Sequence, residues 1–98
     1  MSRNKRKREL RQVVKRILPL VPSGRAVSKA EFEAIHAAVL ACVHEKTKAS
    51  AEQLGRLTAK VLGDLPNEYG RLEERERTWP ALIAYLYTKY LSEVGAVG

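Results

Sequence analysis

The chain has 98 residues, with 18 lysines and arginines against 11 aspartates and glutamates, so its formal net charge is +7. This length fits one domain with a modest core. The single cysteine, Cys42, excludes an internal disulfide and, with only two histidines in the chain, a structural zinc site. Uninterrupted apolar runs such as 37–43 are far shorter than the roughly 20 residues of a membrane-spanning helix. We therefore expect one soluble domain without a membrane span.

The positive charge is concentrated at the N-terminus. Residues 1–16 contain eight bases and one acid, Glu9, and so carry the whole net charge. Residues 17–98 contain ten bases and ten acids and sum to zero. The sequence thus describes a neutral body attached to a cationic segment.

The first expected helix combines this charge with an apolar stripe. Its inward residues recur at the spacing i, i+3, i+4, i+7, i+8, and they are Leu10, Val13, Val14, Ile17 and Leu18. We predict a packed helix near 8–18, which Pro19 ends because its ring disfavours a helical residue before it. Residues 1–7 are then expected to form a flexible basic tail.

A second helix is expected near 29–46. Ser28 and Glu31 have the spacing of a capping box, which marks a helix start. Cys42 lies on the apolar stripe that follows, and we interpret it as a small buried hydrophobe and not as a reactive thiol.

A third helix is expected near 51–62, because Ser50 and Gln53 repeat the capping-box spacing. We expect Pro66 to close this region and residues 67–70 to form a turn. For the mixed-charge stretch 71–77 we expect either a loop or an exposed helical turn.

The last helix is expected near 79–94, with Thr78 as its N-cap, Pro80 in its first turn and Gly95 at its end. No run of alternating β-branched residues competes with these helices. We predict an all-α fold, in which a compact bundle of about four helices forms a single domain over 8–98.

No arrangement of residues supports an enzyme. Glu33 and His36 are three residues apart, as in carboxylate-bridged metal bundles, but the chain has no second pair of this kind. The sequence also lacks a phosphate-binding glycine loop and a credible nucleophile with its base. We therefore expect no catalytic residue, no metal and no cofactor.

The basic segment is the feature that predicts a partner, since clustered cations attract the phosphates of a polyanion. The expected phosphate contacts are Arg3, Lys5, Arg6, Lys7, Arg8, Arg11, Lys15 and Arg16. Three other roles stay open for this segment: a solubilising tail, contact with an anionic membrane surface, and targeting, including nuclear import if the host has a nucleus.

Two weaker features elsewhere also fit nucleic acid. The stretch 50–61 resembles a helix-turn-helix, with Arg56 and Lys60 as possible contacts, although an unbroken helix fits its apolar spacing better. In the last helix, Tyr85 is expected to be exposed one turn before Lys89, where it could stack on a base or anchor a partner. We treat these four residues as possible secondary contacts.

The sequence therefore predicts a small nucleic-acid-binding protein that contacts phosphates through its basic N-terminal helix and tail. The alternative is a protein–protein adaptor or regulatory module whose basic tail docks on an acidic partner surface. DNA and RNA are not distinguished, and a homodimer stays possible. We expect an intracellular protein, either cytoplasmic or nucleoid-associated, or nuclear in a eukaryote.

Overall fold

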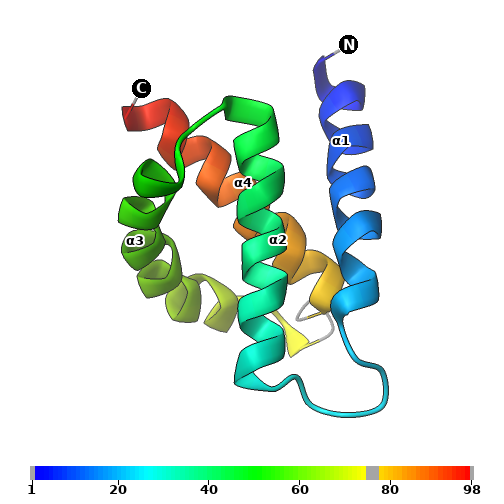
Figure 1. The fold of residues 1–98 in the computed structure, drawn as a ribbon. Helices are drawn as coiled ribbons and strands as arrows, with labels where there is room; N and C mark the ends of the chain where they lie inside the picture. The colour runs from blue at the N-terminus through cyan, green and yellow to red at the C-terminus, as the bar shows by residue number, and fades with distance from the viewer. Residues whose placement is uncertain (1, 75–77, 98) are drawn as a thin grey trace.

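The computed structural model describes residues 2–74 and 78–97, with side chains described for residues 6–74 and 78–95. Its elements, in chain order, are the α-helix α1 (Ser2–Ile17), the 3-10 helix η1 (Leu18–Leu20), and the α-helices α2 (Lys29–Thr47), α3 (Ala51–Gly70) and α4 (Trp79–Val97) (Figure 1). The described residues contain no β-strand. The predicted all-α bundle of four helices is confirmed.

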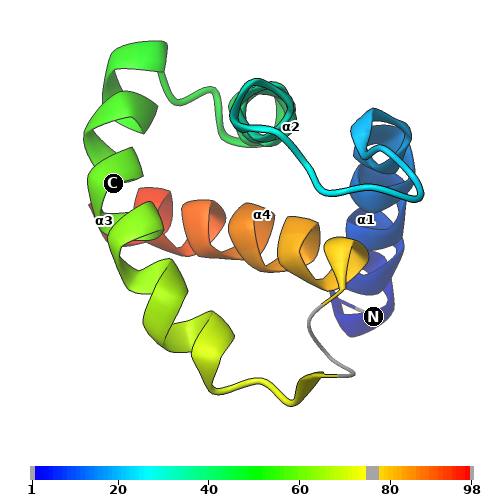
Figure 2. The same ribbon diagram turned by 90° about the horizontal axis from the view of Figure 1, so that it is seen from below.

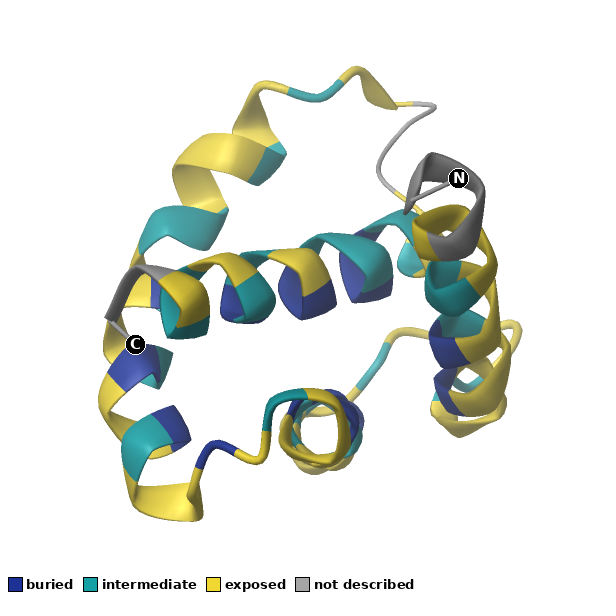
Figure 3. Ribbon diagram, turned by 90° about the horizontal axis from the view of Figure 1, so that it is seen from above, coloured by how far each residue is buried: buried dark blue, intermediate teal, exposed yellow. Residues whose placement is uncertain are grey.

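Helix α4 is the centre of the bundle, because it packs against α1, α2 and α3. It runs between α1 and α3, and α2 crosses it on one side (Figure 2). The buried side of α4 faces α2 (Figure 3). Two of its three tyrosines, Tyr87 and Tyr90, are among the largest fully buried side chains, with 2% and 0% of their surface exposed.

Helix α1 begins at Ser2, and not near Arg8 as predicted. Residues 2–7 contain neither glycine nor proline, and arginine and lysine are good helix formers, so the helix continues through them. The flexible tail expected for residues 1–7 is therefore not confirmed, and Met1 lies outside the described residues. The end at Pro19 is confirmed, since the α-helix stops at Ile17 and gives way to η1.

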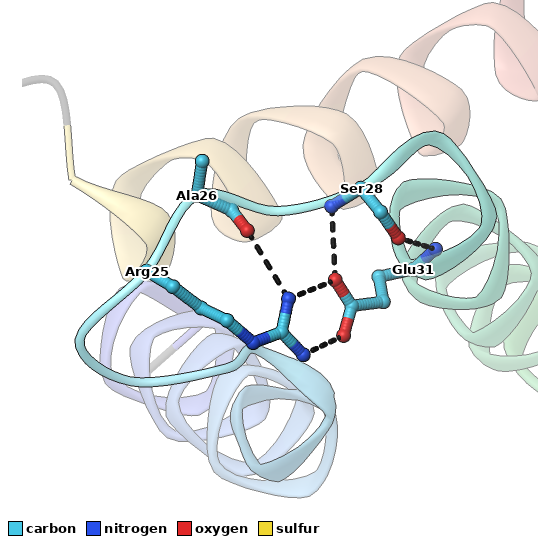
Figure 4. A network of polar contacts seen from close by, with 4 residues as sticks. All are labelled: Arg25, Ala26, Ser28 and Glu31. Carbon is cyan, nitrogen blue, oxygen red and sulfur yellow. Dashed lines mark hydrogen bonds and ion pairs between the residues drawn. The ribbon is translucent and has the colours of Figure 1, made fainter.

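The predicted capping box of α2 is present. Glu31 N donates to Ser28 Oγ at 3.1 Å, and Ser28 N donates to Glu31 Oε1 at 2.9 Å. Both terminal nitrogens of the Arg25 guanidinium donate hydrogen bonds to the carboxylate of Glu31, and one of them also donates to Ala26 O (Figure 4). The hydrogen bonds from Arg25 and Ser28 lower the pKa of Glu31 to about 2. This network attaches the connecting loop to the start of α2.

Helix α3 is longer than predicted and corrects two expectations. It continues through Pro66 to Gly70, so Pro66 does not close the helix and residues 67–70 are not a separate turn. A proline inside a helix removes one backbone hydrogen bond and bends the axis, and α3 changes direction along its length (Figures 1 and 2). The extension is stabilised by tertiary contacts, because Leu65 and Tyr69 pack against the core.

Between α3 and α4, the chain turns at residue 71 and bends at residue 72, and residues 75–77 of the mixed-charge stretch lie outside the described part of the chain. Thr78 is the N-cap of α4 as predicted: Leu82 N donates to Thr78 O at 2.9 Å, and Ala81 N donates to its Oγ1 at 3.4 Å. Gly95 does not end this helix, which runs to Val97. One glycine costs a helix only about 1 kcal/mol, which neighbouring residues can offset.

A polar chain crosses the core and links α2, α4 and α3. Thr58 Oγ1 donates to Leu54 O at 3.0 Å, and Tyr90 OH donates to Thr58 Oγ1 at 3.0 Å. Because the single proton of Tyr90 is used there, its oxygen accepts from His36 Nε2 at 2.7 Å. Burial lowers the pKa of His36 and so favours the neutral ring, which donates to Tyr90 as the tautomer that carries its proton on Nε2. His36 thus has a structural partner and does not pair with Glu33.

Candidate nucleic-acid interface

Four bases form a row along the outer side of α1, which we call the cationic stripe. It consists of Lys7, Arg8, Arg11 and Lys15. At about 100° per residue, these positions fall within about 100° of the helix circumference. All four are exposed, and the described acidic groups form no ion pair with any of them. Helix α1 lies at one edge of the bundle, with its exposed side facing away from the other helices (Figure 3).

Most other predicted contacts are paired within the protein. Arg16 lies outside the stripe and bonds to Glu45 at 3.0 Å. The bases proposed as secondary contacts pair as Arg56 with Glu52, Lys60 with Glu93 at 3.3 Å, and Lys89 with Asp64 at 3.5 Å. The Arg16–Glu45 and Arg56–Glu52 pairs are exposed and contribute only about 0–1 kcal/mol each, so a phosphate can replace the acid there. The stripe differs because its charges meet no described acid at all.

Glu9, the only acid of the first sixteen residues, faces the body of the protein. Tyr87 OH donates to Glu9 Oε1 at 2.6 Å, and Lys46 Nζ lies 3.1 Å from Oε2. The hydrogen bond from Tyr87, with a further contribution from Lys46, lowers the pKa of Glu9. Burial and the bond to Glu9 raise the pKa of Tyr87, so the phenol keeps its proton. We call these three residues the Glu9 cluster.

The Glu9 cluster joins α1 to α2 and α4 and keeps the acid away from the stripe. Sequence reasoning missed it, because Tyr87 is 78 residues from Glu9 and carries no local signal of a carboxylate partner. Arg6 is exposed and close enough to Glu9 to lower its pKa slightly, so it flanks the cluster. The side chains of Arg3 and Lys5 lie outside the described residues.

Two features expected on α3 and α4, the helix-turn-helix and the exposed Tyr85, are not found in the structure. Residues 50–61 do not form a helix-turn-helix, because α3 is continuous from Ala51, as the alternative prediction had it. Tyr85 is half-buried and not exposed, since the added turns of α3 place Leu65 and Tyr69 beside it. Its hydroxyl is buried and has no hydrogen-bond partner among the described residues. It is therefore poorly placed to stack on a base.

Two other properties bear on function. Across the described side chains, histidine, cysteine, aspartate and glutamate nowhere gather in groups of three or more that could hold a metal ion. Within the same described part of the chain, no helix has the length and apolar character needed to cross a membrane. Comparison with protein-family models, curated proteins and solved structures finds no match to this chain. Any function must therefore be argued from the site itself.

Proposed function

We propose that this protein binds nucleic acid, without catalysing a reaction on it, through phosphate contacts from the cationic stripe of α1. The observation that carries the proposal is the stripe itself: four exposed bases on one face of one helix, none paired with a described acid. Clustered, unpaired lysines and arginines are the surface that releases counterions from a phosphate backbone.

The geometry of α1 suits a backbone contact. The helix has 16 residues and is therefore about 24 Å long, which spans several phosphates of one strand. Lys7, Arg11 and Lys15 follow one another at about one helical turn and Arg8 lies beside Lys7, so the bases form a row along the helix axis. Contacts of this kind position a protein on nucleic acid but carry no sequence information. We expect binding to duplex DNA, single-stranded DNA and RNA that depends on phosphate geometry and not on base sequence.

The strength of this interaction is expected to depend steeply on salt. Four phosphate contacts on duplex DNA give a slope of log K against log salt of about −3.6. Raising salt from about 50 to about 200 mM should then weaken binding by roughly 150-fold. Any contact from Arg3, Lys5 or Arg6 would make the slope steeper by about 0.9 each.

Fluorescence anisotropy tests the proposal directly. Labelled duplex DNA, single-stranded DNA and RNA would be titrated with the full chain at about 50, 100 and 200 mM salt. A triple variant removes charge from the stripe by Lys7→Gln, Arg11→Gln and Lys15→Gln. A control variant removes the same charge elsewhere by Lys29→Gln, Lys48→Gln and Arg71→Gln. All six side chains are exposed, so neither variant should disturb folding.

The stripe variant is expected to reduce the magnitude of the slope by about 2.7, and the control by less than about 1. Equal losses in the two variants would show that net charge alone attracts nucleic acid and would contradict a site on α1. Absence of binding at the lowest salt would reject nucleic-acid binding altogether. In that case the protein adaptor becomes the better proposal.

A further inference from the structure

A shallow apolar groove of about 420 Å³ lies between α1 and the start of α4. Its floor is made by Leu10, Val14, Leu18, Pro80 and Ala84. Arg11 and Lys15 are the two bases in its lining. We call this surface the α1/α4 groove. Both of its bases belong to the cationic stripe and form no ion pair with a described acid.

The apolar surface continues past the end of α1. A second hollow of about 570 Å³ lies at the corner formed by η1, and Lys15 and Leu18 line both hollows. Pro19, Val21 and Pro22 extend the apolar lining there. Leu18, predicted to pack inward, is instead 36% exposed, because the α-helix ends before it. The result is a continuous strip of apolar surface with a base at its middle.

This arrangement indicates the chemistry of a partner. A further apolar hollow of about 350 Å³, between α2 and α3, has no lysine, arginine or carboxylate among its described lining residues, and the polar side chain there, His44, already bonds to Ala49 O at 2.7 Å. In the α1/α4 groove, unpaired Arg11 and Lys15 favour carboxylates, and the apolar floor favours aliphatic or aromatic side chains. A nucleic-acid strand would satisfy the bases but would leave the aliphatic floor without a match.

We infer that the α1/α4 groove binds a short amphipathic segment of another protein, in which apolar side chains enter the groove and acidic residues beside them pair with Arg11 and Lys15. This is the helix-in-groove type of recognition, in which a few apolar anchors supply affinity and flanking charges supply orientation. Arg11 and Lys15 belong to both proposed sites, so the peptide and a nucleic acid would compete for them, whereas the apolar floor that selects the peptide plays no part in phosphate contact.

The test uses the 98-residue chain as bait for a displayed library of random peptides of about 16 residues, enough for about four helical turns. Enriched peptides would be synthesised with a fluorescent label and titrated against the wild type and two variants. Leu18→Glu places a charge in the apolar lining. Leu20→Glu is the matched control, since Leu20 is 46% exposed and does not line either hollow.

The two variants change net charge equally, so a purely electrostatic interaction would weaken equally in both. We expect the enriched peptides to combine acidic residues with apolar residues at helical spacing. Leu18→Glu should weaken their binding by about tenfold or more, as for an interface anchor, and Leu20→Glu by less than about twofold. The double variant Arg11→Gln/Lys15→Gln should also weaken it while leaving the floor intact. Circular dichroism would check the fold of each variant.

Three results would overturn the inference. The first is a library that yields no enriched peptide, and the second is enrichment of peptides that lack either acidic or apolar residues. The third is equal weakening by Leu18→Glu and Leu20→Glu. If Leu18→Glu alters the fold, the Arg11→Gln/Lys15→Gln variant decides, and unchanged peptide affinity in it would reject the groove.

Discussion

Replacing Tyr87 by phenylalanine tests how α1 is held in the bundle. The substitution removes the hydroxyl that donates to Glu9 at 2.6 Å and keeps the ring, which is buried in the core. A hydrogen bond to a charged group contributes about 1.5–3 kcal/mol to stability. The Glu9 side chain is 21% exposed and keeps its pair with Lys46, so water and Lys46 replace part of the loss. We expect the free energy of unfolding to fall by about 1–2 kcal/mol, or the Tm by roughly 5–12 °C.

The same substitution should change how stability depends on pH. The bond from Tyr87 is the main cause of the lowered pKa of Glu9. A lowered pKa means that the stabilisation is present above the unfolded pKa of about 4.3 and is lost as pH falls through the folded pKa. In Tyr87→Phe the pKa of Glu9 should rise toward 4.3, as for an unperturbed glutamate, so less stability is lost in this interval. Glu31, far from the substitution, should still titrate near 2.

Urea denaturation of the wild type, Tyr87→Phe, Glu9→Gln and the double variant would measure the coupling free energy between Tyr87 and Glu9. We expect this coupling to be about 1 kcal/mol. Carbon-detected NMR of the side-chain carboxylates would follow the pKa of Glu9. Tyr85→Phe is the matched control, because it removes a buried hydroxyl that has no partner among the described residues and should be neutral or stabilising. The reasoning is refuted if Tyr87→Phe destabilises the protein no more than Tyr85→Phe does, or if Glu9 titrates unchanged.

Three further predictions concern the rest of the bundle. Burial lowers the pKa of His36, so the unfolded chain binds more protons than the folded protein near this pH. The free energy of unfolding should therefore decrease as pH falls from about 6.5 toward the folded pKa. Urea titrations at about pH 7 and pH 5.5 should show a weaker pH dependence for His36→Gln. Leu86 is completely buried, and Leu86→Ala should cost about 2–5 kcal/mol in the same assay, with values below about 1 kcal/mol contradicting a packed core. Lys48 ends α2 with φ 65°, a left-handed conformation that costs a non-glycine residue about 1–2 kcal/mol, so Lys48→Gly should raise the Tm by a few degrees, whereas Lys48→Ala should not.

Much of the fold was predictable because its signals are local. Ser28 and Thr78 cap helices whose starts can be located from a few neighbouring residues, and Pro19 ends α1 for a steric reason that acts on the preceding residue. The cationic segment was equally clear, since eight bases in sixteen residues remain together in any conformation of the chain. These features can be located without knowing the tertiary contacts of the chain.

The errors have a common cause in contacts between distant residues. Pro66 is a strong local signal for a helix end, but Leu65 and Tyr69 pack against the core and keep α3 helical beyond it. That extension in turn covers Tyr85, which the pattern of α4 alone places on the surface. A local preference of a few kcal/mol is overridden when the tertiary structure buries enough apolar surface on the other side.

The candidate site depends both on the local sequence of α1 and on the packing of the helices. The number of bases on α1 and their helical spacing follow from residues 1–16, because a regular helix assigns each position to a face. Only packing determines which face is open: Val13 and Ile17 are buried in the bundle, and Glu9 bonds to Tyr87 on α4. The remaining side carries Lys7, Arg8, Arg11 and Lys15 unpaired, and the approach of Pro80 and Ala84 to α1 creates the groove beside them. Position along the chain sets which charges are present, and contacts between helices set which of them a partner can reach.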